Sequence, residues 1–599
     1  MCGVFRPKHM PAVLVNWVVR LKNKIQTTSG LRLLAKMVST VAIKSLAGRR
    51  CYSIVDRQVS TKVQQKKVTT TNQLTLMVSG GNEANKNKGC DSQYYVAAVV
   101  EYLPTLGSNP LQSIQKNLPV YEDIIANASQ YDVDILVFPE GGLTGLTLPD
   151  DRKDIQQFVT EIPSPESNTI PCFTDKCSII LKKLSCAARL NRIYVVVNLP
   201  EIEYCSKEED PSCADDLANY YNTNVVFDRQ GTIVARYRKF NLFREGGFNV
   251  THSSELCTFD TDFGVRFGMF ICFDILFQNP ANLVIQEKGV KDVVYSTAWF
   301  SEIPLLTADS VQSGWAYTND VNLIAAGYNT PSMSVGGSGI YAGRDGPLVM
   351  VMPDRPGTQI LLSRVLKRQF PDPDTICKSK CSIDKTFMTF MSDGLVLPYG
   401  KEKCPININR PSDLRFFMDK SFKYFHVETM RSELEQDDTL TASMEYEQDG
   451  FACAMTVSWR NENNNATTDY NMFAYSGRRT FGDFLSAHVE TCGLTAYKYR
   501  DSSAGGGGVS YYDPPKSLVT ITAIDIVART SDLTTAVIPT TLNTASYPLT
   551  NDYFTFAKRT VAAEDGRKVL EVSMQLCKPV ANLITFGLYK LPRTDVAVN

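Results

Sequence analysis

Short apolar runs alternate with segments of helical periodicity from residue 95 to residue 326, and this alternation constrains the fold more than any other feature. The run Tyr95–Val100 is apolar throughout, which is typical of a strand buried on both faces, and Leu111–Tyr131 carries apolar residues at helical spacing. The same patterns predict strands at 135–138, 193–199, 224–227, 232–236, 266–273, 293–296 and 322–326, and helices at 178–190, 280–288 and 308–318. Buried strands that alternate with covering helices favour a layered α/β domain.

The pattern changes on both sides of this region. Residues 60–89 are rich in Thr, Gln, Asn, Lys and Gly and have little apolar periodicity, which is typical of a linker. Pro371–Asp374 marks a boundary, and beyond it residues 453–459 and 570–576 alternate apolar with polar side chains, as half-buried antiparallel strands do. We therefore expect a leader and linker over residues 1–91, an α/β domain over 92–385 and a smaller β-rich domain over 386–599.

The charge balance and the histidine content exclude several classes of function. The 62 basic and 63 acidic residues leave a formal net charge of −1, which gives no reason to expect a nucleic-acid partner. Only four histidines are present, and none stands in a pattern typical of a Ser/His/Asp site or a His-rich metal site. We expect a mechanism that uses neither histidine nor metal.

The 16 cysteines show no pairs with zinc-type spacing, so disulfides in an oxidising compartment are the favoured interpretation. Spacing alone does not determine connectivity. Three pairs lie close enough in sequence to form local loops, namely Cys172 with Cys177, Cys205 with Cys213, and Cys377 with Cys381.

Signals for the cellular compartment conflict. Asn-X-Ser/Thr acceptors at Asn127, Asn249 and Asn465 suit a secreted glycoprotein. Residues 1–55, however, contain no Asp or Glu and many Lys and Arg, which resembles a mitochondrial transit peptide more than a secretory signal. No run of about 18 apolar residues predicts a membrane span. We expect a secreted protein, and an artefactual or alternative start would reconcile its leader with that location.

Three ionisable residues each stand where a short strand-like run gives way to a turn. Glu140 follows Phe138-Pro139, Lys239 closes the run Arg236–Arg238, and Cys272 follows Phe267–Ile271. A thiol with an ordinary pKa is only a few per cent ionised at neutral pH, so a nucleophilic cysteine requires a base or a positive neighbour. Separately, a packed cysteine, a turn glutamate and a solvated lysine are the commoner explanations. Together, the three predict a base, an ammonium and a thiol at one sheet edge.

With their surroundings these residues resemble the Glu-Lys-Cys triad of the nitrilase superfamily. Four segments, at 236–243, 268–277, 296–299 and 337–341, are similar to the vanin and biotinidase family of secreted amidohydrolases. The resemblance is strong over about 92–385 and looser in the C-terminal region. It implies a nitrilase-type α-β-β-α sandwich followed by a smaller β-rich domain of vanin type.

The resemblance also implies roles for individual residues. Cys272 would be the nucleophile, Glu140 the general base and later the acid, and Lys239 the stabiliser of the tetrahedral intermediate. Glu245 falls where many family members have a second glutamate, although an exposed loop carboxylate is the alternative. The backbone N–H of Phe273 would be a second oxyanion donor.

Other positions near the expected pocket are less certain in role. Trp299, Tyr237 and Trp315 could line it, although a tryptophan is more often a core residue. Two positions depart from the family pattern: Gly141 stands where vertebrate members commonly have an acidic residue, and Ser296 stands where the family has proline. Both departures leave the triad intact and put the substrate in doubt.

The implied activity is hydrolysis of a linear amide through a thioester on Cys272, with no metal or organic cofactor. Pantetheine and biocytin are the candidate substrates, with a slight preference for pantetheine. A non-hydrolytic binding or adhesion protein and an acyltransferase are the alternatives. The expected partner is a small-molecule amide, with no nucleic acid and no membrane span, and the oligomeric state is left open.

Overall fold

The computed structural model describes residues 93–368, 394–399, 414–430, 439–461, 470–482, 485–496, 511–512, 519–563 and 565–591. The chain divides into two compact units, Met1–Ser79 and Gly80–Asn599, and every described residue belongs to the second. The expectations for residues 1–91, for Asn465 and for the pair Cys377 and Cys381 lie outside the described residues.

The first sheet of the α/β domain has seven strands in the order β14-β13-β1-β2-β3-β4-β5. Its strands are β1 (Tyr94–Glu101), β2 (Ile135–Val137), β3 (Tyr194–Tyr204), β4 (Ala218–Phe227), β5 (Ile233–Arg238), β13 (Thr358–Leu366) and β14 (Gly394–Tyr399). The central strands β1, β2 and β3 run parallel, whereas β4, β5 and β13 pair antiparallel with their neighbours. Because β14 pairs with β13, this sheet extends past residue 385.

The second sheet has six strands in the order β12-β11-β10-β8-β7-β6. Its strands are β6 (Thr258–Asp260), β7 (Arg266–Ile271), β8 (Asp292–Thr297), β10 (Asn322–Gly327), β11 (Ser338–Ala342) and β12 (Pro347–Val351). Strands β7, β8 and β10 are parallel, as the alternation of strands with helices predicts.

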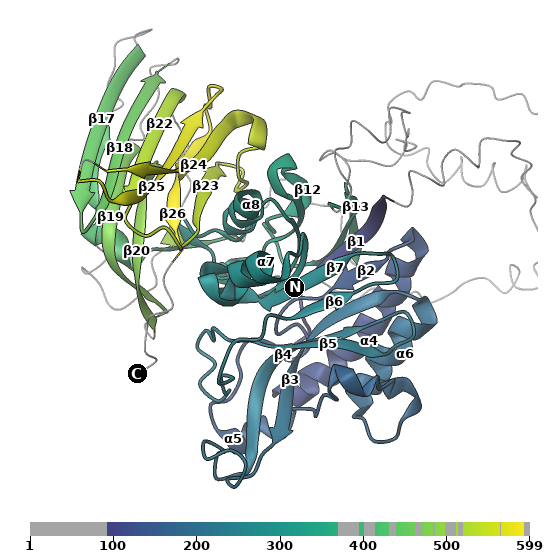
Figure 1. The fold of residues 1–599 in the computed structure, drawn as a ribbon. Coiled ribbons are helices and arrows are strands. Elements are labelled where there is room, and N and C mark those ends of the chain that lie inside the picture. The colour runs from purple at the N-terminus through teal and green to yellow at the C-terminus, as the bar shows by residue number, and fades with distance from the viewer. Residues whose placement is uncertain are drawn as a thin grey trace, which may run out of the picture. The chain divides into compact units, whose positions relative to one another are not determined.

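Two helices cover each outer face, so the domain is the α-β-β-α sandwich that the sequence predicts (Figure 1). Val99 and Val137 share one core with Met269 and Val294 of the second sheet, whereas Leu136 belongs to a separate core beneath the helices on the other face. Alternate side chains of one strand thus enter different layers. The helices are α4 (Pro110–Ala128), α6 (Ile179–Asn191), α7 (Leu283–Lys288) and α8 (Ala308–Asn319).

Two predicted elements end earlier than their apolar periodicity suggests. At the start of helix α4, the side chain of Asn109 accepts a hydrogen bond from Gln112 N at 2.9 Å. The helix stops at Ala128, because the chain enters a 3₁₀ turn and Asp132 then takes a left-handed φ of 53°. The strand predicted at 266–273 ends at Ile271, where a 3₁₀ turn begins. Periodicity detects burial, and burial continues through the second turn, Cys272–Leu276, although not through the first, Ser129–Tyr131.

The C-terminal region is β-rich, as predicted, and forms two antiparallel sheets of five strands. One contains β16 (His426–Met430), β19 (Tyr470–Phe481), β20 (Leu485–Thr495), β26 (Leu583–Lys590) and β23 (Val537–Asn543). The other contains β17 (Thr439–Gln448), β18 (Phe451–Arg460), β22 (Thr520–Thr530), β25 (Lys568–Leu576) and β24 (Phe554–Ala562). Strand β23 packs on α8, where Ser310 Oγ donates to Thr541 O at 2.6 Å.

In the described part of the chain, no helix is long and apolar enough to cross a membrane.

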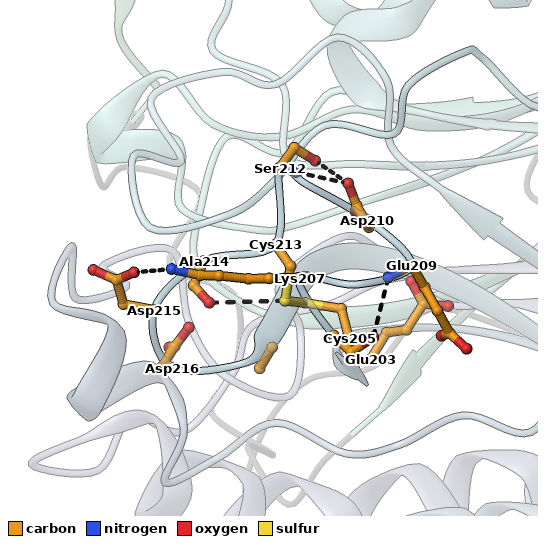
Figure 2. Close-up of a disulfide and its surroundings, with 12 residues drawn as sticks. Glu203, Cys205, Lys207, Glu209, Asp210, Ser212, Cys213, Ala214, Asp215 and Asp216 are labelled. Carbon is orange, nitrogen blue, oxygen red and sulfur yellow. Dashed lines mark hydrogen bonds and ion pairs between the residues drawn. A yellow bond between two sulfur atoms is a disulfide. The ribbon is translucent and has the colours of Figure 1, made fainter.

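The disulfides confirm one sequence prediction and correct another. Cys205 pairs with Cys213 and closes the loop after β3 (Figure 2). Cys172, however, pairs with Cys186 and not with Cys177, which carries a free thiol. The reason is helical geometry: Cys186 lies in α6 on the side that faces Cys172, where the two Cα atoms are 4.9 Å apart. A third disulfide, Cys453–Cys492, joins β18 to β20.

Glu101 at the end of β1 is a buried carboxyl group that should make stability depend on pH. Its Oε2 accepts from Ser338 Oγ at 2.5 Å, yet burial raises its pKa to about 8. Because the pKa is higher in the folded state, Glu101 favours folding fully at pH values below its ordinary pKa of about 4.3, and this contribution is lost as pH rises towards 8.

We expect Glu101→Gln to weaken the decline of the free energy of unfolding between pH 5 and pH 8, because glutamine is neutral throughout. The slope should change by up to about 1.4 kcal/mol per pH unit. Urea unfolding at several pH values measures this, with Glu287→Gln on the exposed side of α7 as the control. Equal slopes in wild type and Glu101→Gln would contradict the raised pKa.

Candidate active site

A buried lysine lies at the centre of the site. Strand β5 ends at Arg238, and the next residue, Lys239, is only 1% exposed. Its Nζ lies 2.6 Å from Glu140 Oε1 and 2.9 Å from Glu245 Oε1. Burial would lower the pKa of Lys239, but the two carboxylates outweigh burial and hold that pKa well above its ordinary value. The side chain is therefore an ammonium ion.

Glu140 follows β2 and Phe138-Pro139 and is buried. Three groups donate to its carboxylate: Lys239 Nζ, Asn222 Nδ2 at 2.8 Å, and the backbone N of Ala298 at 3.2 Å. Burial would raise its pKa, but Lys239 and these hydrogen bonds lower it overall. Glu140 is thus ionised and can accept a proton.

Cys272 follows the last residue of β7 and starts the 3₁₀ turn Cys272–Leu276. Its φ of 47° is left-handed, a conformation that non-glycine residues rarely adopt outside functional turns. The thiol lies close enough to Glu140 and Lys239 for both charges to influence its pKa, and Tyr295 Oη donates to Cys272 O at 2.8 Å. Burial and the charge of Glu140 raise the pKa of the Cys272 thiol, against the opposing effect of Lys239, so the resting group is a neutral thiol near a carboxylate.

Asp274 connects the turn that carries Cys272 to the segment that carries Lys239. Its Oδ2 accepts from Tyr237 Oη at 2.7 Å and from Ile271 N at 3.1 Å, and its Oδ1 accepts from both nitrogens of Asn241 at 2.8 Å. Sequence reasoning did not single out this residue. Its signal is an acidic side chain inside the otherwise apolar run 268–277, which requires polar partners when it is buried.

Asn222 on β4 is a second residue that the sequence did not reveal. The side-chain nitrogen of Asn222, Nδ2, donates to Glu140 Oε1 and to Glu245 Oε1, both at 2.8 Å. Its Oδ1 accepts from Asn198 Nδ2 at 2.6 Å. Asn222 therefore holds the two carboxylates on either side of the ammonium of Lys239.

Glu245 lies in the loop after Lys239, and its side chain is only 13% exposed. Its Oε1 contacts Lys239 and Asn222, whereas Oε2 has no hydrogen-bond partner among the described residues. Burial raises its pKa to about 7, partly offset by Lys239. The structure therefore places Glu245 within the cluster that Glu140 and Lys239 form.

Both departures from the family pattern have a local reason. Gly141 has a left-handed φ of 66°, and a Cβ there would lie 2.8 Å from Leu146 Cδ2. The hydroxyl of Ser296 donates to Phe138 O at 2.7 Å, just before Glu140. Neither residue projects a charge towards the site.

The aromatic residues expected at the pocket have different environments. Trp299 is largely buried, and its Nε1 donates to Leu306 O at 2.9 Å. Tyr237 is fully buried and supports the site through Asp274, while Trp315 lies in the core against Phe270. Contact of Trp299 or Tyr237 with substrate stays a prediction, as does the oxyanion role of the N–H of Phe273.

Two of the sequon asparagines, Asn127 and Asn249, are described by the structure. Asn127 is in the last turn of α4, and the side-chain oxygen of Asn249 accepts from Tyr220 N at 2.9 Å. Their glycosylation stays a prediction. Among residues that the structure describes, no group of three or more His, Cys, Asp or Glu side chains is arranged to hold a metal ion.

The domain has two sheets between helices, and a glutamate, a lysine and a cysteine lie at adjoining strand ends. These are features of a carbon-nitrogen hydrolase, and residues 97–343 match that family. Residues 415–595 match the Vanin C-terminal domain. Vanin-like protein 1 of Drosophila melanogaster is 33% identical over 515 residues, which cover 83% of this chain and 86% of that protein. The chain therefore belongs to the vanin-like carbon-nitrogen hydrolases, which act on non-peptide carbon-nitrogen bonds.

Other relatives share less of the chain or less of the sequence. Biotinidase of Homo sapiens is 41% identical over 266 residues, covering 42% of this chain and 48% of that protein. A nitrilase-superfamily structure, Nit3 of Saccharomyces cerevisiae, aligns at 20% identity and a TM-score of 0.36, covering 49% of this chain and 97% of that one. Similarity along most of the chain is thus to the vanin-like proteins.

We expect Asn222→Leu to raise the pKa of Glu140, because the carboxylate loses a donated hydrogen bond. Hydrogen bonds to charged groups are worth about 1.5–3 kcal/mol, so the shift should be about one pH unit or more. Alkylation of Cys272 by iodoacetamide, followed by peptide mass spectrometry across pH, reports it. Asn219→Leu, on the other face of β4, is the control. An unchanged pH profile would show that Asn222 does not tune Glu140.

Proposed function

We propose that the protein hydrolyses a linear small-molecule amide through a thioester on Cys272. The observation that carries this proposal is the buried ammonium of Lys239, held between Glu140 and Glu245 and near the thiol of Cys272. The arrangement supplies a nucleophile, a proton acceptor and a fixed positive charge in a buried setting, where electrostatic stabilisation is strongest.

In the acylation half-reaction, Glu140 accepts the thiol proton as the sulfur of Cys272 attacks the amide carbon. The carbonyl oxygen gains a negative charge, which Lys239 Nζ and the backbone N–H of Phe273 stabilise. Glu140 then donates the proton to the amide nitrogen, the carbon-nitrogen bond breaks, and the amine leaves. The acyl group remains on Cys272 as a thioester.

In the deacylation half-reaction, Glu140 accepts a proton from water as the water oxygen attacks the thioester carbon. A second tetrahedral intermediate forms, and its collapse breaks the carbon-sulfur bond and releases the carboxylic acid. The proton on Glu140 returns to sulfur, which restores the thiol. Glu245 assists by fixing Lys239, because the two lie 2.9 Å apart.

The substrate class is a small carboxamide such as pantetheine or biocytin. Support comes from the similarity to vanin-like proteins along most of the chain and to biotinidase over part of it. We prefer pantetheine slightly. We further infer secretion, because the three disulfides in the described residues suit an oxidising compartment.

We expect Cys272→Ala to abolish amide hydrolysis with the fold intact, and Glu140→Gln to lower kcat by about 10²–10⁴, because glutamine cannot accept the proton. Cys257→Ala, which removes another free thiol packed beside the same core, is the matched control and should retain activity. Circular dichroism checks that each variant folds. Turnover by Cys272→Ala would refute the thioester mechanism.

Separate incubations with pantetheine and biocytin should identify the amide that is cut. Release of cysteamine, detected with a thiol reagent, indicates the first substrate, and release of biotin indicates the second. Adding hydroxylamine tests for an acyltransferase, since acyl transfer to an added amine in preference to water would replace the free acid as the main product. Release of neither product, together with no acylation of Cys272, would contradict both substrate assignments.

A further inference from the structure

A side chain of the C-terminal domain lies against the turn that presents Cys272. Phe481, the last residue of β19, is buried, and its ring centroid lies 5.5 Å from that of Phe273 in an edge-to-face arrangement. Phe273 also packs on Phe243 and Phe277, at 5.1 and 5.0 Å. Residues from two domains therefore enclose the side chain that directly follows Cys272.

Two residues before Phe481, on the same face of β19, Arg479 is a buried cation. Its side chain is only 2% exposed and forms ion pairs with Glu302 and, at 3.3 Å, with Asp419. Its guanidinium also lies 4.8 Å from the ring centroid of Phe481. Removing one partner of such a buried group is destabilising, because the remaining charge is left uncompensated.

Glu302 belongs to the segment 298–306, which begins at the catalytic cluster. The backbone N of Ala298 donates to Glu140 Oε2 at 3.2 Å, and Trp299 Nε1 donates to Leu306 O at 2.9 Å. Glu302 and Leu306 then exchange two backbone hydrogen bonds, of 3.0 and 2.8 Å. The segment is a closed loop whose first residue contacts the proposed base and whose middle residue, Glu302, contacts Arg479.

A short strand pairing fixes the same loop from the other side. Glu302–Ile303 (β9) pairs in parallel with Phe416–Met418 (β15), and Asp419 N donates to Ile303 O at 3.0 Å. Both carboxylates that surround Arg479 therefore lie at this pairing. Burial raises the pKa of Glu302 to about 7, and the charge of Arg479 opposes that rise. The guanidinium therefore favours the ionised form of Glu302.

We propose that Arg479 and Phe481 are positioning residues of the catalytic centre, through which the C-terminal domain holds the pocket wall in place. Arg479 fixes the loop 298–306, and Phe481 supports the turn that carries Cys272. This inference rests on the proposed function, because it assigns the two residues to the reaction of Cys272. Neither residue contacts the reacting atoms.

Strand β19 supplies a matched control for the arginine. Arg478 lies next to Arg479 but on the opposite face, is exposed, and its Nε donates to Ser486 Oγ at 3.5 Å. Arg479→Met and Arg478→Met remove the same charge from adjacent positions. Only the first removes a charge that is buried against the loop 298–306.

The test compares these two variants and Arg479→Lys in the full chain. We expect Arg479→Met to lower kcat/KM at least tenfold on an amide that the wild type hydrolyses, mainly through kcat, and to change the alkylation rate of Cys272 by iodoacetamide. Arg479→Lys should restore part of both, and Arg478→Met should stay within twofold of wild type. A loss of thermal stability in Arg479→Met, with kcat/KM and alkylation rate unchanged, would overturn the proposal.

A second variant covers the case in which Arg479→Met does not fold. Phe481→Leu keeps an apolar side chain but removes the ring that contacts Phe273, and we expect a roughly fivefold change in the same two rates. Phe473→Leu on the same strand, whose ring packs on Phe422 and Phe425, is its control and should leave both rates unchanged. Equal effects of the two phenylalanine variants would overturn the proposal.

Alkylation separates this inference from the proposed function. Iodoacetamide reacts with the thiol of Cys272 whether or not an amide substrate has been found. If the wild type hydrolyses no amide offered, the substrate assignment fails, yet a changed alkylation rate in Arg479→Met alone would still support the positioning role. If the wild type hydrolyses its substrate and Arg479→Met does so equally well, the positioning role fails and the proposed function stands.

Discussion

The buried ammonium of Lys239 is the interaction on which the rest of the site depends. Moving a charged group out of water costs several kcal/mol unless partners compensate for it, and here Glu140 and Glu245 do so at 2.6 and 2.9 Å. The charges of Lys239, Glu140 and Glu245 compensate one another, so the segments that carry them must lie together. The ends of β2 and β5 and the loop at Glu245 are thus held together by electrostatics as well as by the two sheets.

A second constraint acts through Asp274. Cys272 adopts a left-handed φ, which the surrounding structure must hold in place, and Asp274 does this by accepting from Ile271 N on one side and from Tyr237 and Asn241 on the other. The turn after β7 is thereby attached to the segment after β5. The thiol of Cys272 and the ammonium of Lys239 keep their relative positions because one buried carboxylate, Asp274, joins the two segments that carry them.

Local patterns in the sequence predict most elements of the α/β domain, but they place Glu140, Lys239 and Cys272 at the edge of one sheet. Glu140 and Lys239 do follow strands of the first sheet, β2 and β5, whereas Cys272 follows β7 of the second, because the sequence does not show which strands pair. The helix predicted at 308–318 is α8 (Ala308–Asn319), because its periodicity is local. Asn222 could not be found in this way, since its contacts with two carboxylates follow from the register of β4 against β3. The Cys172–Cys186 pairing likewise depends on which face of α6 is turned inwards.

The C-terminal domain is coupled to the site by the same physics that assembles the site itself. The side chain of Asp419 is 3% exposed and that of Glu302 is 33% exposed, and Arg479 of β19 supplies the guanidinium between them. Without β19, Glu302 would lose this cation. Glu302 lies in the loop 298–306, and the first residue of that loop donates to Glu140. A continuous path of described contacts thus leads from Arg479 of the C-terminal domain, through Glu302 and the loop 298–306, to Glu140 in the α/β domain.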